Sequence, residues 1–193
     1  MKFSYPENAT PLDLDEIAAL IPKHITTQEE LNAWEEKNIL NAERWASKKK
    51  DILSISFIKE LHFQMFNKTW GWAGQFRISS SKNIGIDWHL ISSNVKNLCD
   101  NIKYQLDHEI FSKDEIAIRF HHQLVWIHSF PNGNGRHARL ISDLLIKLHG
   151  RQRFSWGGRQ DLSKSCEVRR QYIEALRSAD RGDYSKLIIF ART

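Results

Sequence analysis

Apolar residues recur at helical spacing along most of the chain. Ile116, Phe120, Leu124 and Ile127 follow one another at intervals of three or four residues, which predicts the buried face of a helix over residues 112–130. The same periodicity predicts further helices over residues 26–46, 54–70, 92–110, 135–150 and about 161–179, and a short last helix from residue 184.

Polar residues mark where several of these helices begin. A hydroxyl side chain just before a helix accepts a hydrogen bond from a backbone N–H of the first turn. The predicted capping residues are Thr27, Ser92 or Ser93, and Ser112. Glu30 and Glu115 lie three residues after two of them, which is the spacing of a capping box.

One stretch departs from the helical pattern. Residues 72–90, WAGQFRISSSKNIGIDWHL, are rich in Ser and Gly with short β-like pieces, which predicts a β-hairpin or an ordered loop. The 193 residues contain no internal repeat and are most economically one domain. We therefore predict an all-α, mainly helical fold: a helical bundle with one small β-hairpin.

The composition, with 41% apolar and 26% charged residues, is typical of a soluble globular protein. The sequence contains neither an apolar run long enough for a membrane span nor the apolar core of a signal peptide. Two distant cysteines, Cys99 and Cys166, favour a reducing compartment, so we expect a cytoplasmic protein. The net charge of +5 suits nucleic acid or an anionic ligand. However, the compact basic run at Lys48–Lys50 is typical of a solvated linker, so direct nucleic-acid binding is not expected.

The segment WIHSFPNGNGRHAR joins two of the predicted helices through a tight turn. Gly133 and Gly135 permit backbone conformations that a Cβ would block, and Asn134 tolerates a left-handed conformation. The free N–H groups and the dipole of the following helix favour an anion. Arg136 and Arg139 are one turn apart, so both guanidinium groups can reach the same anion. This pattern suits a polyphosphate.

His128 is the last residue that the preceding helix delivers before the turn. An imidazole beside bound phosphates can take a proton from an incoming hydroxyl, and Phe130 would hold the turn against the core. The residues alone therefore favour phosphate-centred group transfer with His128 as general base. The alternative is a glycine-rich connection between helices in which the histidine is satisfied locally.

Residues 128–139, HSFPNGNGRHAR, resemble the Fic-family signature HxFx[D/E]GNGRxxR at every defining position except Asn132. The segment GWAGQFR, which ends at Arg77, resembles the part of the family that leads into its target-binding flap. Residues 169–190 resemble the end of the Fic fold.

The resemblance extends toward the N-terminus. Residues 21–46 are similar to a bacterial Fic subgroup called mobile mystery protein B. The implied organisation is a single Fic-type domain over residues 1–193, in which an N-terminal helical extension, 1–50, precedes a Fic core, 51–193.

The resemblance implies a protein adenylyltransferase that moves AMP from ATP to a Ser, Thr or Tyr hydroxyl of a target protein. The implied roles are those of the general base, His128; the anion hole for the α- and β-phosphates, Gly133, Asn134 and Gly135; a phosphate contact, Arg136; a γ-phosphate contact, Arg139; and a structural residue, Phe130. The implied flap, about residues 77–88, aligns an extended target segment by main-chain pairing. Its candidate residues are Ile78, Ser79, Ser80, Ser81, Lys82, Asn83, Ile84, Gly85 and Ile86.

Asn132 stands where the family carries the acid that coordinates Mg²⁺. Magnesium prefers charged oxygen ligands. We therefore expect weak binding of Mg²⁺, or of Mn²⁺ as the alternative ion, through the Asn132 carbonyl or a water, and slower transfer. Two alternatives stay open: another donor nucleotide in place of ATP, or a nucleotide-binding pseudo-enzyme that has lost turnover.

Many Fic enzymes are inhibited by a helix with the pattern [S/T]xxxE[G/N]. This chain has three pairs with that spacing, Thr26 with Glu30, Ser56 with Glu60 and Ser163 with Glu167, but none is followed by Gly or Asn. Either inhibition comes from a separate protein, or the enzyme is not inhibited in this way. The resemblance to the mobile mystery group implies the first: a toxin-like protein that is inhibited by a separate, small helix-turn-helix partner resembling an antitoxin.

Overall fold

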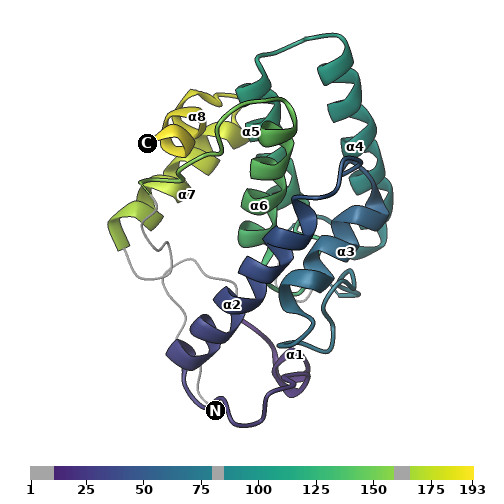
Figure 1. The fold of residues 1–193 in the computed structure, drawn as a ribbon, viewed down its shortest axis with the longest axis vertical. Coiled ribbons are helices and arrows are strands. Elements are labelled where there is room, and N and C mark those ends of the chain that lie inside the picture. The colour runs from purple at the N-terminus through teal and green to yellow at the C-terminus, as the bar shows by residue number, and fades with distance from the viewer. Residues whose placement is uncertain (1–10, 80–84, 159–165) are drawn as a thin grey trace.

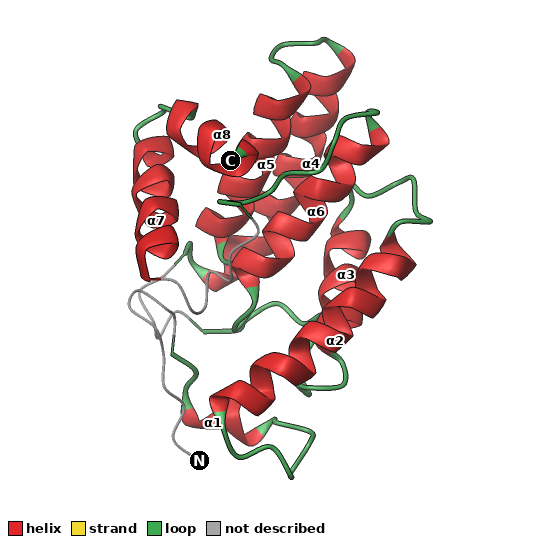
Figure 2. Cartoon of the chain, turned by 60° about the vertical axis from the view of Figure 1, so that its left-hand side comes forward, coloured by secondary structure: helices red, strands yellow, loops and turns green. Residues whose placement is uncertain are grey.

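The computed structural model describes residues 11–79, 85–158 and 166–193, and its regular structure is helical (Figures 1 and 2). The helices are α1 (Leu14–Ala18), α2 (Gln28–Ala46), α3 (Ile55–Phe66), α4 (Ile91–Asp107), α5 (Lys113–Ile127), α6 (Asn134–Leu148), α7 (Cys166–Asp180) and α8 (Ser185–Arg192), with a 3₁₀ turn, η1 (Trp88–Leu90), before α4. Across these described ranges no β-strand forms, and an isolated bridge pairs Leu20 with Trp70. The prediction of a mainly helical fold is confirmed.

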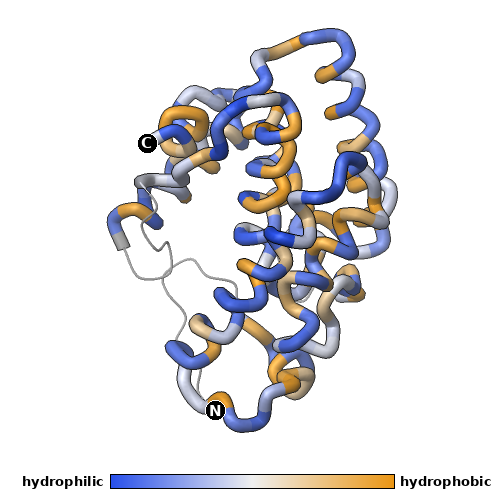
Figure 3. The backbone as a smooth tube through the Cα atoms, in the orientation of Figure 1, coloured by the Kyte–Doolittle hydropathy of each residue, from blue (hydrophilic) through white to orange (hydrophobic). Residues whose placement is uncertain are grey.

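Helices α5 and α6 pack against each other at the centre of the molecule (Figure 1). Helix α4 packs along α5, α3 contacts both α2 and α6, and the α7–α8 pair reaches α5 through α8. The predicted apolar stripe of α5 is fully buried, at Ile116, Phe120, Leu124 and Ile127. Burying each such side chain contributes about 1.5–3 kcal/mol, and apolar segments follow these central helices in Figure 3. No helix within the described ranges is both long and apolar enough to cross a membrane.

The predicted capping residues Thr27 and Ser112 both start helices. Thr27 Oγ1 accepts from the N–H of Glu30, and the Glu30 carboxylate accepts from the N–H of Thr27, which completes a capping box at α2. Ser112 Oγ accepts from the N–H of Glu115 at the start of α5. The Glu115 carboxylate there accepts from Arg119, one turn further along the helix.

The prediction that Ser92 or Ser93 opens the next helix is wrong. Helix α4 begins at Ile91, because η1 runs directly into it and Leu90 occupies the cap position. Ser93 Oγ donates to the Leu90 carbonyl, so its hydroxyl bonds backward as a donor and does not accept from the first turn.

The predicted hairpin shows no strand in its described flanks, at Ile78, Ser79, Gly85 and Ile86. Outside the described ranges lie Ser80, Ser81, Lys82, Asn83 and Ile84. The N–H of Arg77 donates to the Ser129 carbonyl at 2.9 Å, and the N–H of Ile86 donates to the Ile127 carbonyl at 3.4 Å. Both flanks are therefore attached to the end of α5, where a helix leaves carbonyl groups without intrahelical donors.

Candidate functional site

The turn between α5 and α6 contains two left-handed residues. His128 follows the last residue of α5 with φ 53° and ψ 59°, and Gly133 precedes α6 with φ 78°. A non-glycine residue rarely adopts this conformation, which costs about 1–3 kcal/mol. The surrounding structure therefore holds His128 in place, and its half-buried side chain lies at the junction of the two helices.

Gly133 cannot be replaced without a clash. A Cβ at this position would lie 2.7 Å from the Phe66 ring, and its φ of 78° disfavours any residue with a side chain. The chain thus passes in contact with an aromatic side chain of α3, and this contact places the N-terminus of α6.

The Asn134 side chain closes the turn from within. Its Oδ1 accepts from the N–H of Phe130 at 2.9 Å, and its Nδ2 donates to the Phe130 carbonyl at 2.7 Å. Phe130 is buried in the core, as predicted. Because both polar atoms of the Asn134 amide are used internally, any ligand at this helix end would meet the backbone N–H groups of the first turn.

His62, a buried residue of α3, binds the backbone of the turn through its side chain. Its Nδ1 accepts from the N–H of Gly74 at 3.0 Å, so Nε2 carries the proton and donates to the Asn132 carbonyl at 3.1 Å. The ring stacks on Phe130 with centroids 3.7 Å apart. Burial, followed by the nearby His137, holds the pKa of His62 well below its usual range, so the imidazole is neutral.

Arg139 lies beside the N-terminus of α6. A Cβ on Gly135 would lie 3.6 Å from Arg139 Nη1, and the guanidinium lies over the Tyr172 ring at 5.6 Å. Burial is the main cause that lowers the pKa of Arg139, and hydrogen bonding to the Tyr172 hydroxyl opposes it. A positive charge and the positive end of the helix dipole therefore meet at one place, which favours an anion.

Arg136 has different neighbours. Its Nη1 lies 2.6 Å from Oε2 of Glu35 in α2, and its guanidinium lies 5.0 Å from the centre of the Phe66 ring. Glu35 Oε1 also accepts from Trp70 Nε1 at 2.7 Å. We predicted that both arginines reach one anion, but in the structure Arg136 is paired with Glu35 of α2, which would compete with that anion for the guanidinium.

Asn132 does not offer the oxygen donors that Mg²⁺ prefers. Its Oδ1 accepts from the N–H of Gly133 at 2.6 Å, and its carbonyl accepts from His62. The part of the chain that the structure describes contains no group of three His, Cys, Asp or Glu side chains placed to hold a metal. The donor set thus fits a divalent ion poorly, since a neutral amide already engaged by the backbone replaces a carboxylate.

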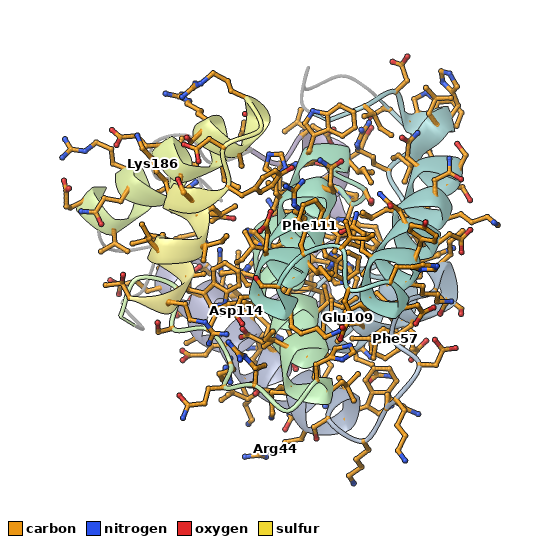
Figure 4. The ribbon with its side chains drawn as sticks, turned by 90° about the horizontal axis from the view of Figure 1, so that it is seen from above. Arg44, Phe57, Glu109, Phe111, Asp114 and Lys186 are labelled. Atoms are coloured by element: carbon orange, nitrogen blue, oxygen red, sulfur yellow. The ribbon has the colours of Figure 1, made fainter. Side chains whose placement is uncertain are left out.

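A cavity of about 480 Å³ lies at the opposite end of α5. It is lined by Glu109, Ile110, Phe111, Ser112, Lys113 and Arg151. Figure 4 shows Phe111 and Asp114 near this end of the helix, with Lys186 projecting outward from α8. Because the 15 residues of α5 span about 22 Å, the cavity does not belong to the turn that carries His128.

Three residues at this site were not singled out by the sequence: Glu35, His62 and Arg77. Glu35 and His62 lie within helical stretches, where a single charged or polar side chain on a helix carries no signal of its distant partner. Arg77 was noted only as the end of GWAGQFR and the start of the implied flap. Its side chain makes four hydrogen bonds to backbone carbonyls around the flap and α5.

Comparison with known proteins identifies the domain. Residues 52–146 match the Fic/DOC family. Over 84 residues the chain is 33% identical to "Protein adenylyltransferase Fic" from Nematostella vectensis. That match covers 44% of this chain and 18% of the relative, so the chain corresponds to less than a fifth of that protein's length.

Solved structures share the fold. Fic-1 from C. elegans (aa134–508) superimposes with a TM-score of 0.66 at 21% identity, over 95% of this chain and 55% of that one. BepC from Bartonella tribocorum, solved with bound AMPPNP, superimposes with a TM-score of 0.66 at 16% identity, over 97% of this chain and 93% of that one. The match over residues 52–146 assigns a Fic/DOC family domain to that part of the chain, and the chain shares the fold of solved Fic structures.

Proposed function

We propose that the chain transfers AMP from ATP to a hydroxyl group of a target protein, with His128 as general base. The proposal rests on one arrangement: His128 ends α5 at the turn where α6 begins, and Arg139 lies beside Gly135 at that helix start. A base thus lies on one side of a short turn, and a positively charged site that can bind an anion lies on the other side. The relative named as an adenylyltransferase and the fold neighbour with bound AMPPNP support a nucleotide as the ligand.

The proposed step is a single displacement. The target hydroxyl oxygen attacks the α-phosphorus of ATP, its proton passes to the His128 imidazole, and the bond between the α-phosphorus and the bridging oxygen breaks to release pyrophosphate. The N–H groups at Gly135 and the Arg139 guanidinium would neutralise phosphate charge, and such preorganised donors supply most of the catalysis in transfers of this kind. Arg136 would be a second phosphate contact only if a ligand draws it from Glu35.

Transfer is tested with labelled ATP and the purified chain in a cell lysate. The native chain should label at least one protein, and His128→Ala should abolish the label. His149→Ala, which alters an exposed histidine at the other end of α6, is the matched control and should label as the native chain does. A panel of other labelled nucleotides, each with Mg²⁺ and with Mn²⁺, tests the donor and the ion. Absence of labelling with every nucleotide, together with absence of nucleotide binding by calorimetry, would refute the proposal.

A second candidate is a nucleotide-binding pseudo-enzyme. The observation that favours it is the Asn132 Oδ1 engaged by the N–H of Gly133, in place of a free carboxylate. Asn132→Asp separates the two candidates, because a carboxylate has a second oxygen that can bind an ion while the first keeps the backbone bond. A pseudo-enzyme gains transfer only in this variant, whereas an adapted enzyme transfers equally well or better with Asn132.

We further propose that this is a toxin-like cytoplasmic protein of the mobile mystery protein B subgroup, inhibited by a separate helix-turn-helix partner. The support is the similarity of residues 21–46 and the absence of the complete inhibitory pattern from the sequence. Co-expression with the product of an adjacent helix-turn-helix reading frame should suppress labelling, and the two proteins should co-purify. Full labelling in the presence of a co-purifying partner would contradict this.

A further inference from the structure

Arg77 holds together three pieces of backbone that are distant in the sequence. Its Nε donates to the His128 carbonyl at 2.7 Å and its Nη1 donates to the Ser79 carbonyl at 2.8 Å. Its Nη2 donates to the Ile86 carbonyl and, at 3.5 Å, to the Ile127 carbonyl. Its own N–H donates to the Ser129 carbonyl. One side chain therefore bonds both described flanks of the flap and the residue proposed as the general base.

The fork geometry of arginine makes this arrangement specific. A guanidinium presents five N–H donors in one plane, whereas a lysine ammonium is a point charge with three rotatable donors on a flexible stem. All four carbonyls belong to the backbone, so Arg77 fixes the course of the chain and not the rotamer of another side chain. A positive charge at the C-terminal end of α5 also complements the helix dipole there.

Contact between the flap and His128 is direct as well. A Cβ added to Gly85, whose φ is 78°, would lie 2.5 Å from His128 Cβ and 2.9 Å from Arg77 Nη2. We call Arg77, together with the backbone carbonyls that it binds, the clamp. Only a residue without a side chain fits between His128 and this clamp. The backbone at Gly85, in the second flank of the flap, thus runs in van der Waals contact with His128, in the place that Arg77 determines.

We propose that Arg77 is a positioning residue that fixes the described flanks of the flap, at Ser79 and Ile86, relative to His128, so that a target hydroxyl bound beside these flanks meets its base. The catalytic part of this inference rests on the proposed function. Arg77 contacts neither nucleotide nor target in this role, and it acts through the backbone of His128, Ser79 and Ile86. The consequence is a defect in transfer to the protein acceptor with nucleotide binding preserved.

The test compares Arg77→Gln with Arg77→Lys and Gly85→Ala. Misplacement of reacting groups by about 1 Å costs on the order of 100-fold in rate. Arg77→Gln should therefore lower kcat/KM for the acceptor protein on the order of 100-fold, while the Kd for nucleotide, measured by calorimetry, changes less than about 2-fold. Arg77→Lys keeps the charge but not the planar fork of donors and should restore part of the loss. Gly85→Ala places a Cβ against both His128 and Arg77 Nη2, which displaces the flanking backbone, and should reproduce the acceptor defect.

Two controls separate positioning from a general loss of stability. Arg170→Gln removes an exposed arginine that pairs with Glu167 in α7. Ile102→Val shortens a buried side chain of α4, away from the turn. Both variants should keep the native kcat/KM for the acceptor. If Ile102→Val lowers the melting temperature as much as Arg77→Gln does, it should still keep this kcat/KM, which shows that lower stability alone does not cause the acceptor defect.

Backbone hydrogen exchange tests the clamp independently of activity. In Arg77→Gln the amide of Ile86, which donates to the Ile127 carbonyl, should exchange at least about 10-fold faster, with the amides of α6 unchanged. If the native chain shows no transfer activity and the variant still shows this faster exchange, the proposed function is refuted, but the role of Arg77 in holding the backbone is supported. Native exchange at Ile86 in the variant, or nucleotide and acceptor binding that weaken together, would overturn the role of Arg77.

Discussion

Removal of the Glu35 carboxylate should destabilise the fold strongly, because this one group links α2 to Trp70, which follows α3, and to Arg136 in the first turn of α6. Glu35 is 4% exposed, its Oε2 lies 2.6 Å from Arg136 Nη1, and its Oε1 accepts from Trp70 Nε1 at 2.7 Å. Glu35→Ala leaves the buried Trp70 indole N–H without its acceptor. It also leaves the Arg136 guanidinium, 34% exposed, without its counter-charge.

The magnitude follows from these two losses. A buried donor left without an acceptor costs about 1–3 kcal/mol. Breaking a buried ion pair by removing one partner costs about 3–5 kcal/mol, but water reaches Arg136 and reduces that share. We expect Glu35→Ala to lower the free energy of unfolding by about 3–4 kcal/mol, which corresponds to roughly 10 °C in melting temperature for a chain of this length. Glu35→Gln keeps an acceptor for Trp70 and should cost about half as much.

Urea unfolding followed by tryptophan fluorescence and circular dichroism measures this change, with Glu36→Gln as the matched control. Glu36 is the exposed neighbour in the same helix, and its change should stay within about 0.5 kcal/mol of the native chain. A double-mutant cycle of Glu35→Gln with Arg136→Gln should give a coupling of about 0.5–3 kcal/mol. A stability within 0.5 kcal/mol of native for Glu35→Ala, or a coupling near zero, would refute the reasoning about this ion pair.

Three further predictions concern buried groups. Burial lowers the pKa of His121 to about 3 and of His137 to about 4, so the native state binds fewer protons than the unfolded state below about pH 6.5. The free energy of unfolding should therefore have its full value above pH 6.5 and fall as the pH drops toward 4. Urea titrations at several pH values measure this fall. Burial raises the pKa of Asp143 to about 6, which gives the opposite slope between about pH 4 and 6 and weakens the trend; no net fall below pH 6.5 in Asp143→Asn would contradict the histidine argument. Burial raises the pKa of the Cys99 thiol to about 11, so mass spectrometry should find Cys99 unmodified by iodoacetamide in the native state and modified in urea; rapid native labelling would show that α4 opens. Gly133→Ala should cost more than about 2 kcal/mol in urea unfolding because of its positive φ and the Phe66 ring, whereas Gly182→Ala, also at positive φ but with open space, should cost less.

Local sequence patterns predicted most of the helices, because periodicity and caps are properties of neighbouring residues. The stripe that ends at Ile127 and the capping box at Thr27 both appear as expected. The start of α4 was misplaced because a serine before a helix and a serine inside its first turn look alike in sequence. The hairpin was predicted from composition, but the described flanks bond to α5, and composition does not record such a partner.

The turn itself could be predicted, since its glycines, histidine and arginines all fall within residues 128–139. Its supports could not, because they come from far along the chain. Glu35 and Arg136 are 101 residues apart, His62 and Asn132 are 70 apart, and Arg77 and His128 are 51 apart. Each support is a single charged or polar side chain, and one such residue on a helix or in a loop has no periodicity that points to its partner.

These three supports bind different parts of the turn and fix different quantities. Arg77 binds the His128 carbonyl and so determines where the proposed base lies relative to the flap. His62 binds the Asn132 carbonyl and, as a neutral imidazole, determines the position of Asn132. Glu35 holds Arg136 and leaves Arg139 beside Gly135. Because the three contacts are made by separate elements, substitutions in them should have different effects. A change at Arg77 should alter transfer to the acceptor, and a change at His62 should alter the effect of Asn132→Asp. A change at Glu35 should alter global stability together with phosphate affinity. The residues before the turn thus shape the site as much as the motif itself does.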